Sequence, residues 1–278
     1  MININGTIIP SKEVSLSSEN RAFKYGDGVF ETIKFENNKI VFFEDHYFRL
    51  MASMRMLRMK IPMKFTLEFL EEEILKTIKS VISDNSTFRV RMTIYRKDGG
   101  HYLPKTNEVD YLINVHPIHS KHKETYKIDL YKDLYNYSGL LSTVKTTNRI
   151  LNTLASIFAE ENGLDNCILL NENKSIVEVA NGNIFIVKGN IIKTPALNDG
   201  CIKGVTRKKV IEIIGKHPDY TIEETSISPF EIQKADEVFI TNSIIGIQSV
   251  TNYRKKKFSK EVTNKLQKSL RLLAITEF

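Results

Sequence analysis

The chain has 278 residues, of which 41% are hydrophobic and 26% charged, a composition typical of a soluble protein long enough for two domains. No apolar run approaches the ~18 residues that cross a bilayer, so we expect no membrane partner. Residues 1–10 lack the layout of a signal peptide, and only Cys167 and Cys201 are present. We therefore expect a cytoplasmic protein without a disulfide framework. The net charge of +7 does not predict nucleic-acid binding, because lysines and acids are interspersed along the chain, and it is instead compatible with an anionic substrate or cofactor.

The first third of the chain predicts a small sheet. Residues 2–9 form a hairpin pattern, because isoleucines alternate with polar residues around Asn5-Gly6, a strong signal for a type I′ turn. A loop should follow, and then Gly26 and Gly28 flank an aspartate, which suggests close approach of another backbone. Further strands are expected at 29–35, 40–43, 87–96 and 109–115.

Two helices are expected within this region. Residues 44–59 are amphipathic with acids in the first turn, and a second helix should span about 66–82. On the first helix Phe48, Met51, Met54 and Leu57 are expected to face the core.

A domain boundary is expected near Pro117, which interrupts regular structure before a polar segment. His116, His119 and His122 are evenly spaced there, but no carboxylate or cysteine completes a ligand set, so we predict no metal site. The expected organisation is an N-terminal domain over 1–117, a linker over 118–125 and a C-terminal domain over 126–278.

The second half predicts more strands than helices. A helix pattern follows residue 149, another covers 206–215, a short helical turn covers 229–233, and a final helix covers 259–274. Strands are expected at 126–131, 167–170, 175–179, 183–187, 191–194, 220–225, 237–241 and 246–250.

Lys145 stands at a turn that enters a helix, with apolar neighbours beside its stem. Partial desolvation lowers the pKa of an ammonium group, and a neutral amine can attack a carbonyl to form a Schiff base. A solvated surface lysine is the alternative reading of this position.

Glu178 is a lone acid in the apolar run 176–179. A buried carboxylate requires a partner, and the protonated pyridine nitrogen of pyridoxal phosphate would provide one. The alternative is a side chain that points to solvent from a half-buried strand.

A phosphate site is suggested by three separate groups. Gly204, Val205 and Thr206 stand at a predicted helix start, where backbone N–H groups and the helix dipole attract anions. Asn242-Ser243 at a strand end would add donors, and Arg49 on the first helix has the planar guanidinium that suits phosphate. A simple helix cap and a surface arginine are the alternatives.

Six stretches, in this order, resemble the class IV aminotransferases, the pyridoxal phosphate enzymes of fold type IV. They are YGDGVFET (25–32), HYFRL (46–50), KTTNR (145–149), EVANGNIF (178–185), GCIKGVTR (200–207) and TNSIIGIQSV (241–250). The resemblance implies a two-domain α/β (α+β) fold like that of D-amino-acid aminotransferase, with a small N-terminal α/β domain and a larger C-terminal domain of mixed, barrel-like sheet. It also implies a homodimer with the active site near the domain and subunit interfaces.

The resemblance also assigns roles by motif position. It makes Lys145 the Schiff-base lysine and Glu178 the partner of the pyridine nitrogen. The other cofactor contacts that it implies are Arg49, Arg149, Asn183, Gly204, Val205, Thr206, Asn242 and Ser243. The substrate contacts that it implies are Phe30, His101 and Tyr102.

Within this family three features favour a lyase, and one departs from the lyase pattern. Arg149 stands where branched-chain aminotransferases generally have a tyrosine, and Asn242-Ser243 resembles the lyases. Phe30 stands where D-amino-acid aminotransferases have a tyrosine, and His101 departs from the arginine of some lyases. We therefore predict a 4-amino-4-deoxychorismate lyase that forms 4-aminobenzoate and pyruvate. The alternatives are a transaminase of the branched-chain type and, outside enzymes, a binding protein without a cofactor.

Overall fold

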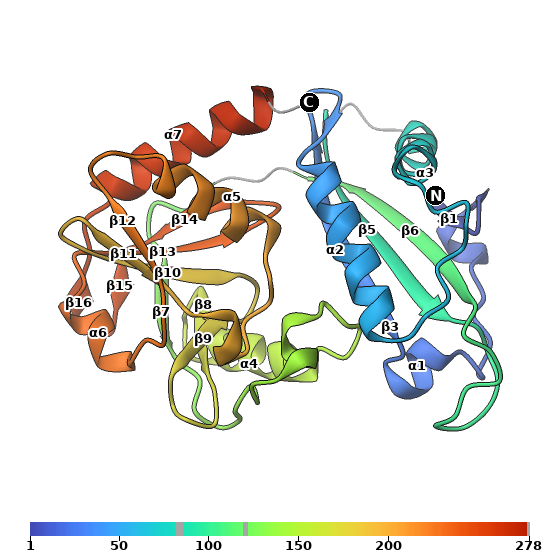
Figure 1. The fold of residues 1–278 in the computed structure, drawn as a ribbon, viewed down its shortest axis with the longest axis horizontal. Coiled ribbons are helices and arrows are strands. Elements are labelled where there is room, and N and C mark those ends of the chain that lie inside the picture. Colours follow the sequence, from blue (N-terminus) through green and yellow to red (C-terminus); the bar gives the residue numbers. More distant parts are fainter. Residues whose placement is uncertain (82–85, 119–121, 277–278) are drawn as a thin grey trace. The chain divides into compact units, whose positions relative to one another are not determined.

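The computed structural model describes residues 1–81, 86–118 and 122–276. Its contacts divide the chain into two compact units (Figure 1). Unit 1 consists of Met1–Ser120 with Lys145–Asn148, and unit 2 consists of Lys121–Val144 with Arg149–Phe278. The predicted linker at 118–125 falls partly on residues 119–121, which lie outside the described residues.

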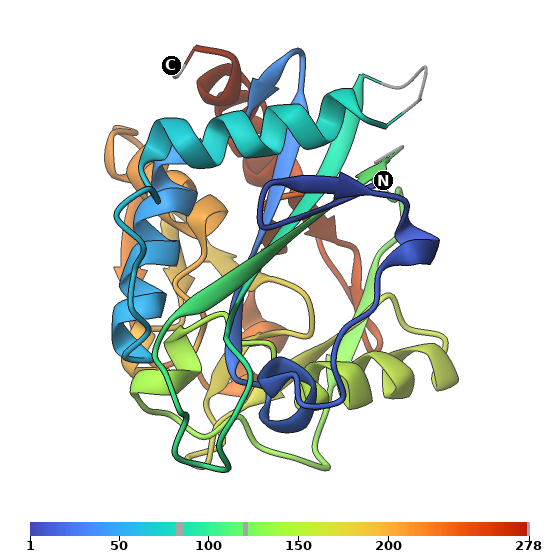
Figure 2. The same ribbon diagram turned by 90° about the vertical axis from the view of Figure 1, so that its right-hand side faces the viewer.

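Unit 1 is built on one six-stranded sheet with the order β2-β1-β6-β5-β3-β4 and antiparallel neighbours. Its strands are β1 (Ile2–Ile4), β2 (Thr7–Ile9), β3 (Gly28–Glu36), β4 (Lys39–Ile40), β5 (Thr87–Arg96) and β6 (Val109–Pro117). The β1–β2 hairpin lies at one edge of the sheet (Figure 2), and Asn5 and Gly6 in its turn have φ of 51° and 93°. Positive φ at both positions is what a type I′ turn requires.

The helices of unit 1 are α1 (Arg21–Tyr25), α2 (Phe43–Met56) and α3 (Leu67–Lys79), with a 3-10 turn at Ser11–Glu13. α2 packs on β3, and α3 packs on β1 and β6 (Figure 1). Met51 and Met54 are buried as predicted, but Phe48 is 59% exposed, so its predicted place in the core is wrong. The buried stripe runs through His46, Leu50 and Met54, and Phe48 lies on the other side of the helix.

The segment Lys145–Asn148 belongs to unit 1, whereas the predicted C-terminal domain included it. Thr146 forms a β-bridge with Val29. The N–H of Phe30 donates to the carbonyl of Lys145 at 2.9 Å, and the N–H of Thr147 donates to the carbonyl of Gly28 at 2.9 Å. These main-chain bonds attach the segment to the start of β3, a pairing across more than a hundred residues that local patterns do not reveal.

Unit 2 contains two five-stranded sheets, with the orders β12-β11-β10-β13-β14 and β16-β15-β7-β8-β9. The first sheet comprises β10 (Asn183–Lys188), β11 (Ile191–Thr194), β12 (Thr221–Glu224), β13 (Glu237–Asn242) and β14 (Gly246–Val250). The second comprises β7 (Lys127–Leu130), β8 (Asn166–Leu170), β9 (Ile176–Val179), β15 (Asn252–Tyr253) and β16 (Lys256–Lys257). Both sheets mix parallel and antiparallel pairs, as the predicted mixed sheet implies.

The helices of unit 2 are α4 (Ile150–Glu161), α5 (Val205–Gly215), α6 (Pro229–Lys234) and α7 (Glu261–Thr276), with 3-10 turns at Leu140–Thr143 and Leu197–Asp199. α4 packs on β8, α5 on β13, and α7 on β13 and β14. Of the apolar residues of α4, Leu151 and Phe158 pack inward, whereas Ile150, Leu154 and Ile157 are exposed.

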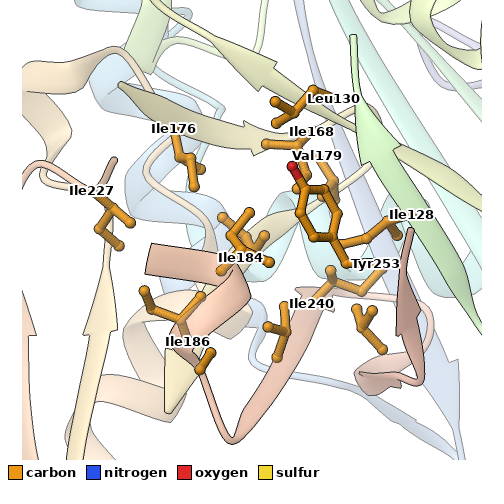
Figure 3. Packing of buried hydrophobic residues seen from close by; sticks show 14 of the residues in the cluster. Ile128, Leu130, Ile168, Ile176, Val179, Ile184, Ile186, Ile227, Ile240 and Tyr253 are labelled. Carbon is orange, nitrogen blue, oxygen red and sulfur yellow. The ribbon is translucent and has the colours of Figure 1, made fainter. Parts of the chain in front are cut away.

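The main core of unit 2 lies between its two sheets. Ile168 and Val179 from one sheet meet Ile184 and Ile240 from the other (Figure 3). Every residue of β8 is buried, because alternate side chains enter this core and a second cluster beneath α4. The continuous apolar run of β8 follows from this burial on both faces.

No helix among the residues of the described ranges is long and apolar enough to cross a membrane. The same ranges contain no group of three histidine, cysteine or acidic side chains that could hold a metal ion. His119, one of the three evenly spaced histidines, lies outside these ranges.

Candidate active site

Lys145 is held at the start of β3 by the main-chain bonds described above. Its ammonium lies 4.4 Å from the centroid of the Phe30 ring, which is buried. A Cβ at residue 28 would meet the Ile94 carbonyl at 3.0 Å and Thr147 Cγ2 at 3.1 Å. Gly28 therefore permits the close backbone approach that the sequence predicted, and this approach brings the lysine beside the aromatic ring.

Arg91 of β5 is a second cation on the same ring. The carbon centre of its guanidinium lies 3.6 Å from the centroid of Phe30. The Phe30 ring thus has an amine and a guanidinium beside it, and cation–π attraction favours both contacts. Arg91 is not among the site residues predicted from the sequence, because its only local signal is a polar residue at an alternating position of the strand.

Arg49, a predicted phosphate ligand, is held by the buried carboxylate of Glu31. Nε of Arg49 donates to Oε1 of Glu31 at 2.8 Å, and its Nη2 donates to Oε2. Nδ1 of His46 lies 2.7 Å from the same Oε2. The bidentate ion pair fixes the orientation of the guanidinium.

Protonation in this cluster is set by burial and pairing together. Burial by itself would raise the pKa of Glu31, but the charge and hydrogen bonds of Arg49 and the hydrogen bond of His46 outweigh it and lower the pKa to about 2. Burial lowers the pKa of His46, and Glu31 offsets this only in part. At neutral pH the cluster therefore contains a carboxylate, a guanidinium and a neutral imidazole.

Glu178 lies on β9 with 3% of its surface exposed, which excludes the solvent-facing alternative. It stands opposite Leu169 of β8, so the two side chains share a face, the one that packs beneath α4. The N–H of Ile202 donates to Oε2 of Glu178 at 3.0 Å. The role of Glu178 toward a cofactor stays a prediction.

The start of α5 is an uncapped helix N-terminus. Gly204 is the N-cap, and among the described residues it has no side-chain cap hydrogen bond. Thr206 and Val205 are both buried in the first turn. Nδ2 of Asn183 donates to the carbonyl of Ile202 at 2.9 Å, and a Cβ at residue 204 would collide with Oδ1 of Asn183. Asn183 therefore fixes the backbone ahead of the helix, and only glycine fits there. Backbone N–H groups in this arrangement form an anion site.

Asn242 and Ser243 lie where β13 ends. Oδ1 of Asn242 accepts from the N–H groups of Ile244 and Ile245 at 3.0 and 2.9 Å. The carbonyl oxygen of this side chain is thus engaged in a local turn, and its amide nitrogen is the group suited to an anion.

Arg149, at the N-cap of α4, donates from Nη2 to the carbonyl of Val144 at 2.5 Å. His101 and Tyr102 lie in the exposed loop between β5 and β6. Among the described residues of unit 1, neither side chain makes a hydrogen bond or ring contact with Phe30 or Lys145. The predicted substrate contacts are therefore not all brought together within unit 1.

The polar groups of unit 2 fit the phosphate and the pyridine ring of pyridoxal phosphate. The buried hydroxyl of Thr241 has no hydrogen-bond partner among the described residues, and Thr241 stands directly opposite Asn183. An unpaired buried hydroxyl costs about 1–3 kcal/mol, so a bound acceptor is expected beside it. With the N-terminus of α5 for phosphate and the carboxylate of Glu178 for a pyridinium, the donor set suits this cofactor.

Comparison with known proteins gives the family. Residues 28–253 match the family model for amino-transferase class IV. The chain belongs to the class IV aminotransferases. This confirms the family that the six sequence stretches predicted.

Among class IV aminotransferases, the chain is 28% identical over 254 residues to a Methanocaldococcus jannaschii protein provisionally named a branched-chain-amino-acid aminotransferase, covering 90% of this chain and 86% of that protein. Two solved structures share its fold with a TM-score of 0.85. One is a Legionella pneumophila protein provisionally named a 4-amino-4-deoxychorismate lyase, 24% identical, covering 94% of this chain and 96% of that one. The other is the branched-chain amino acid aminotransferase of Thermobaculum terrenum in its pyridoxal phosphate form, 21% identical, covering 98% and 93%.

The predicted fold class, fold type IV, is thereby confirmed over nearly the whole chain. Similar sequences are named as branched-chain aminotransferases and as D-alanine aminotransferases, whereas the lyase name belongs to the Legionella pneumophila structure. The comparisons therefore favour the aminotransferase alternative over the predicted lyase.

Proposed function

We propose that this chain is a pyridoxal-phosphate-dependent aminotransferase that moves the amino group of an amino acid with an apolar side chain to a 2-oxo acid. The observation that carries the proposal is the pair of cations on the Phe30 ring, Lys145 at 4.4 Å and Arg91 at 3.6 Å. The amine can transfer a proton, and the guanidinium can bind a substrate carboxylate. The apolar ring surface suits an aliphatic side chain. The similarity to branched-chain aminotransferases supports the same reading.

The proposed cofactor contacts follow from the donor groups. We propose that Lys145 is the attachment point of the cofactor and that Glu178 binds its ring nitrogen. The proposed phosphate and phenolic-oxygen contacts are Arg49, Arg149, Gly204, Val205, Thr206, Asn242 and Ser243. When bound, pyridoxal phosphate supplies an electron sink for the negative charge that develops at the substrate Cα.

The residues of the chain have separate tasks in this proposal. The amine of Lys145 takes the proton from Cα and returns one during transfer. Arg91 binds the substrate carboxylate, and Phe30 provides an apolar wall that excludes water. The carboxylate of Glu178 stabilises positive charge on the ring nitrogen.

A lyase that forms 4-aminobenzoate and pyruvate is the second candidate. It is supported by Arg149, by Asn242-Ser243 and by the similarity to the Legionella pneumophila protein. The proton transfer by Lys145 is common to both reactions, so the catalytic residue does not distinguish them.

The test is a comparison of kcat/KM on one preparation of the holoenzyme. Donors are the L-branched amino acids and D-alanine with 2-oxoglutarate, and the lyase substrate is 4-amino-4-deoxychorismate. We expect the branched-chain value to exceed the lyase value by at least about tenfold, or about 1.4 kcal/mol. The reverse ratio would replace the proposal with the lyase.

The control is Lys145→Ala, which should abolish every turnover in the panel. Borohydride treatment of the wild type should label Lys145 and change its cofactor absorbance. Absence of a visible cofactor band after reconstitution with pyridoxal phosphate would support the binding protein without a cofactor.

A further inference from the structure

We propose that Arg21 is a positioning residue that holds the loop of residues 97–104 and thereby sets the affinity for the amino substrate. The proposal rests on the proposed function, because the loop carries His101 and Tyr102, the predicted substrate contacts. Within the described part of unit 1, Arg21 makes its hydrogen bonds to Asp27 and to the main chain of the loop. It acts through the main chain of the loop.

One guanidinium contacts four consecutive carbonyl groups of the loop. Nη1 of Arg21 donates to the carbonyls of Gly99 at 3.1 Å, Gly100 at 3.4 Å and His101 at 2.6 Å. Nη2 donates to the carbonyl of Tyr102 at 3.5 Å. Arg21 is 3% exposed, so its guanidinium depends on these partly buried carbonyls in place of water.

The guanidinium is itself anchored by the carboxylate of Asp27. Nε of Arg21 and Nε of Arg96 donate to the same Oδ2 of Asp27 at 2.8 and 2.9 Å. Arg96, also buried, continues to the carbonyl of Leu57 at 2.7 Å and to Oδ1 of Asn107 at 2.5 Å. The network thus connects the loop to α1, to the end of β5 and to the segment after α2.

Charge balance explains why the loop carbonyls point toward the Arg21 guanidinium. Two buried guanidinium groups share one carboxylate, which leaves an excess positive charge in a desolvated position. Carbonyl dipoles pointing at Arg21 compensate for this excess. The loop is therefore part of the charge balance, and its conformation is determined by it.

Apart from Arg21, the contacts of the loop lie at its base, where Gly100 and Pro104 form an isolated β-bridge and the N–H of Lys97 donates to the carbonyl of Glu108 at 2.9 Å. Gly99 and Gly100 have φ of 109° and 80°, and the N–H of Lys105 reaches the carbonyl of Gly99 only at 3.4 Å. Tyr102 is 90% exposed, and its ring lies 5.7 Å from that of Tyr25 on α1. The side chains at the tip of the loop are largely in solvent, so the tip is held mainly through its main-chain carbonyls, which accept from Arg21.

Arg21→Lys tests the proposal, because it keeps the charge but replaces a planar fork with a single ammonium that cannot span four carbonyls. The matched control is Arg254→Lys in unit 2, whose arginine also pairs with an aspartate, Asp129, at 3.0 Å but is exposed. In the holoenzyme, hydrogen–deuterium exchange of residues 97–105 should be at least about tenfold faster in Arg21→Lys and unchanged in the control. Unchanged exchange in Arg21→Lys would show that Arg21 does not hold the loop.

The substrate part of the proposal is tested by kinetics. Arg21→Lys should raise KM for the amino donor at least about tenfold with kcat within about threefold, because a loop that only holds substrate affects ground state and transition state alike. The affinity for pyridoxal phosphate should stay within about threefold. A fall in kcat and cofactor affinity together would indicate a merely structural role and overturn the assignment.

A double-mutant cycle shows whether Arg21 acts through the loop. In a His101→Ala, Tyr102→Ala background, Arg21→Lys should raise KM less than about threefold further. An undiminished tenfold rise would overturn the proposed route. If the wild type shows neither aminotransferase nor lyase turnover, the proposed function fails, and so does the effect of Arg21 on substrate affinity. The exchange experiment still decides whether Arg21 holds the loop.

Discussion

Ion pairs between a carboxylate and an arginine, with at least one partner buried, recur at the scale of single residues. Glu31 fixes Arg49 on α2, and Asp27 fixes Arg21 and Arg96. Removing one partner of a buried pair leaves an uncompensated charge and commonly costs about 3–5 kcal/mol. The same ion pair therefore stabilises the fold and orients the arginine side chain, so a substitution in it should affect both stability and binding.

Glu31→Gln should weaken both the fold and cofactor binding. The folded-state pKa of Glu31 is lowered from 4.5 to about 2, which corresponds to roughly 3 kcal/mol of stability. Because the folded pKa is the lower one, this contribution is present above about pH 4.5 and is lost as pH falls toward 2. Urea unfolding of wild type and variant at pH 7 and at pH 3 should show a difference that shrinks at the lower pH.

The control for this experiment is Glu36→Gln, at the exposed end of the same strand, where the carboxylate pairs with Lys34 at 2.8 Å. It should change stability by less than about 0.5 kcal/mol. A stability difference between wild type and Glu31→Gln that does not depend on pH would contradict the argument.

Glu178→Gln should leave the fold intact and lower kcat about a hundredfold. The amide oxygen can still accept from the N–H of Ile202, but an amide stabilises a charged ring nitrogen far less than a carboxylate does. The measurements are kcat and the absorbance spectrum of the bound cofactor. Glu172→Gln, an exposed acid of the same unit, is the control, and a wild-type spectrum with wild-type turnover in Glu178→Gln would refute the role.

At the scale of elements, the helix starts of unit 2 differ in how their backbone N–H groups are satisfied. α6 has a complete capping box from Ser228 and Glu231. α7 is capped from a distance, since Glu237 of β13 accepts from the N–H groups of Val262 and Thr263 at 2.9 Å. α5 has no side-chain cap, which is consistent with the phosphate site proposed there.

Glu237→Gln should destabilise the docking of α7. The carboxylate is 2% exposed and also accepts from the hydroxyl of Thr263 at 2.7 Å, so an amide NH2 would face donors without an acceptor. We expect a loss of about 1–3 kcal/mol, measured by urea unfolding. Glu261→Gln, an acid in the first turn of the same helix, should cost less than about 0.5 kcal/mol. Equal effects of the two substitutions would show that Glu237 is not the cap.

At the scale of the whole molecule, α4 has an apolar stripe that its own unit leaves uncovered. Ile150, Leu154 and Ile157 are 62%, 37% and 46% exposed and recur at i, i+4 and i+7. Contiguous exposed apolar surface on a helix marks an interaction site. The family resemblance implies a homodimer, and we propose that this stripe contacts a second copy of the chain.

Light scattering during gel filtration should therefore give a mass near 64 kDa, twice the 32.0 kDa of one chain. The double substitution Leu154→Glu, Ile157→Glu should shift the mass to one chain, because charges on the stripe oppose its burial. Ser156→Glu on the flank of α4 is the control. A dimer that persists in the double variant would place the contact elsewhere.

The sequence by itself determined the elements and the family. Turn residues such as Asn5-Gly6, the alternation in 87–96 and the helix period in 44–59 act over a few residues, so their structures could be predicted with small errors at the ends. Gly26 and Gly28, on either side of an aspartate, indicated close approach of another backbone. Six motifs in order then identified the class IV aminotransferases.

Only the tertiary structure decided which of these elements and side chains meet. It placed Lys145–Asn148 on β3, put Phe48 outside and brought Arg91 to the Phe30 ring. It also showed the short helix α1, where a loop was expected. The hydrogen bonds from Arg21 to the loop of residues 97–104 were likewise visible only in the tertiary structure. Local periodicity indicates which face of an element is buried. Pairings between residues tens of positions apart depend on how those faces pack, and packing is a property of the whole fold.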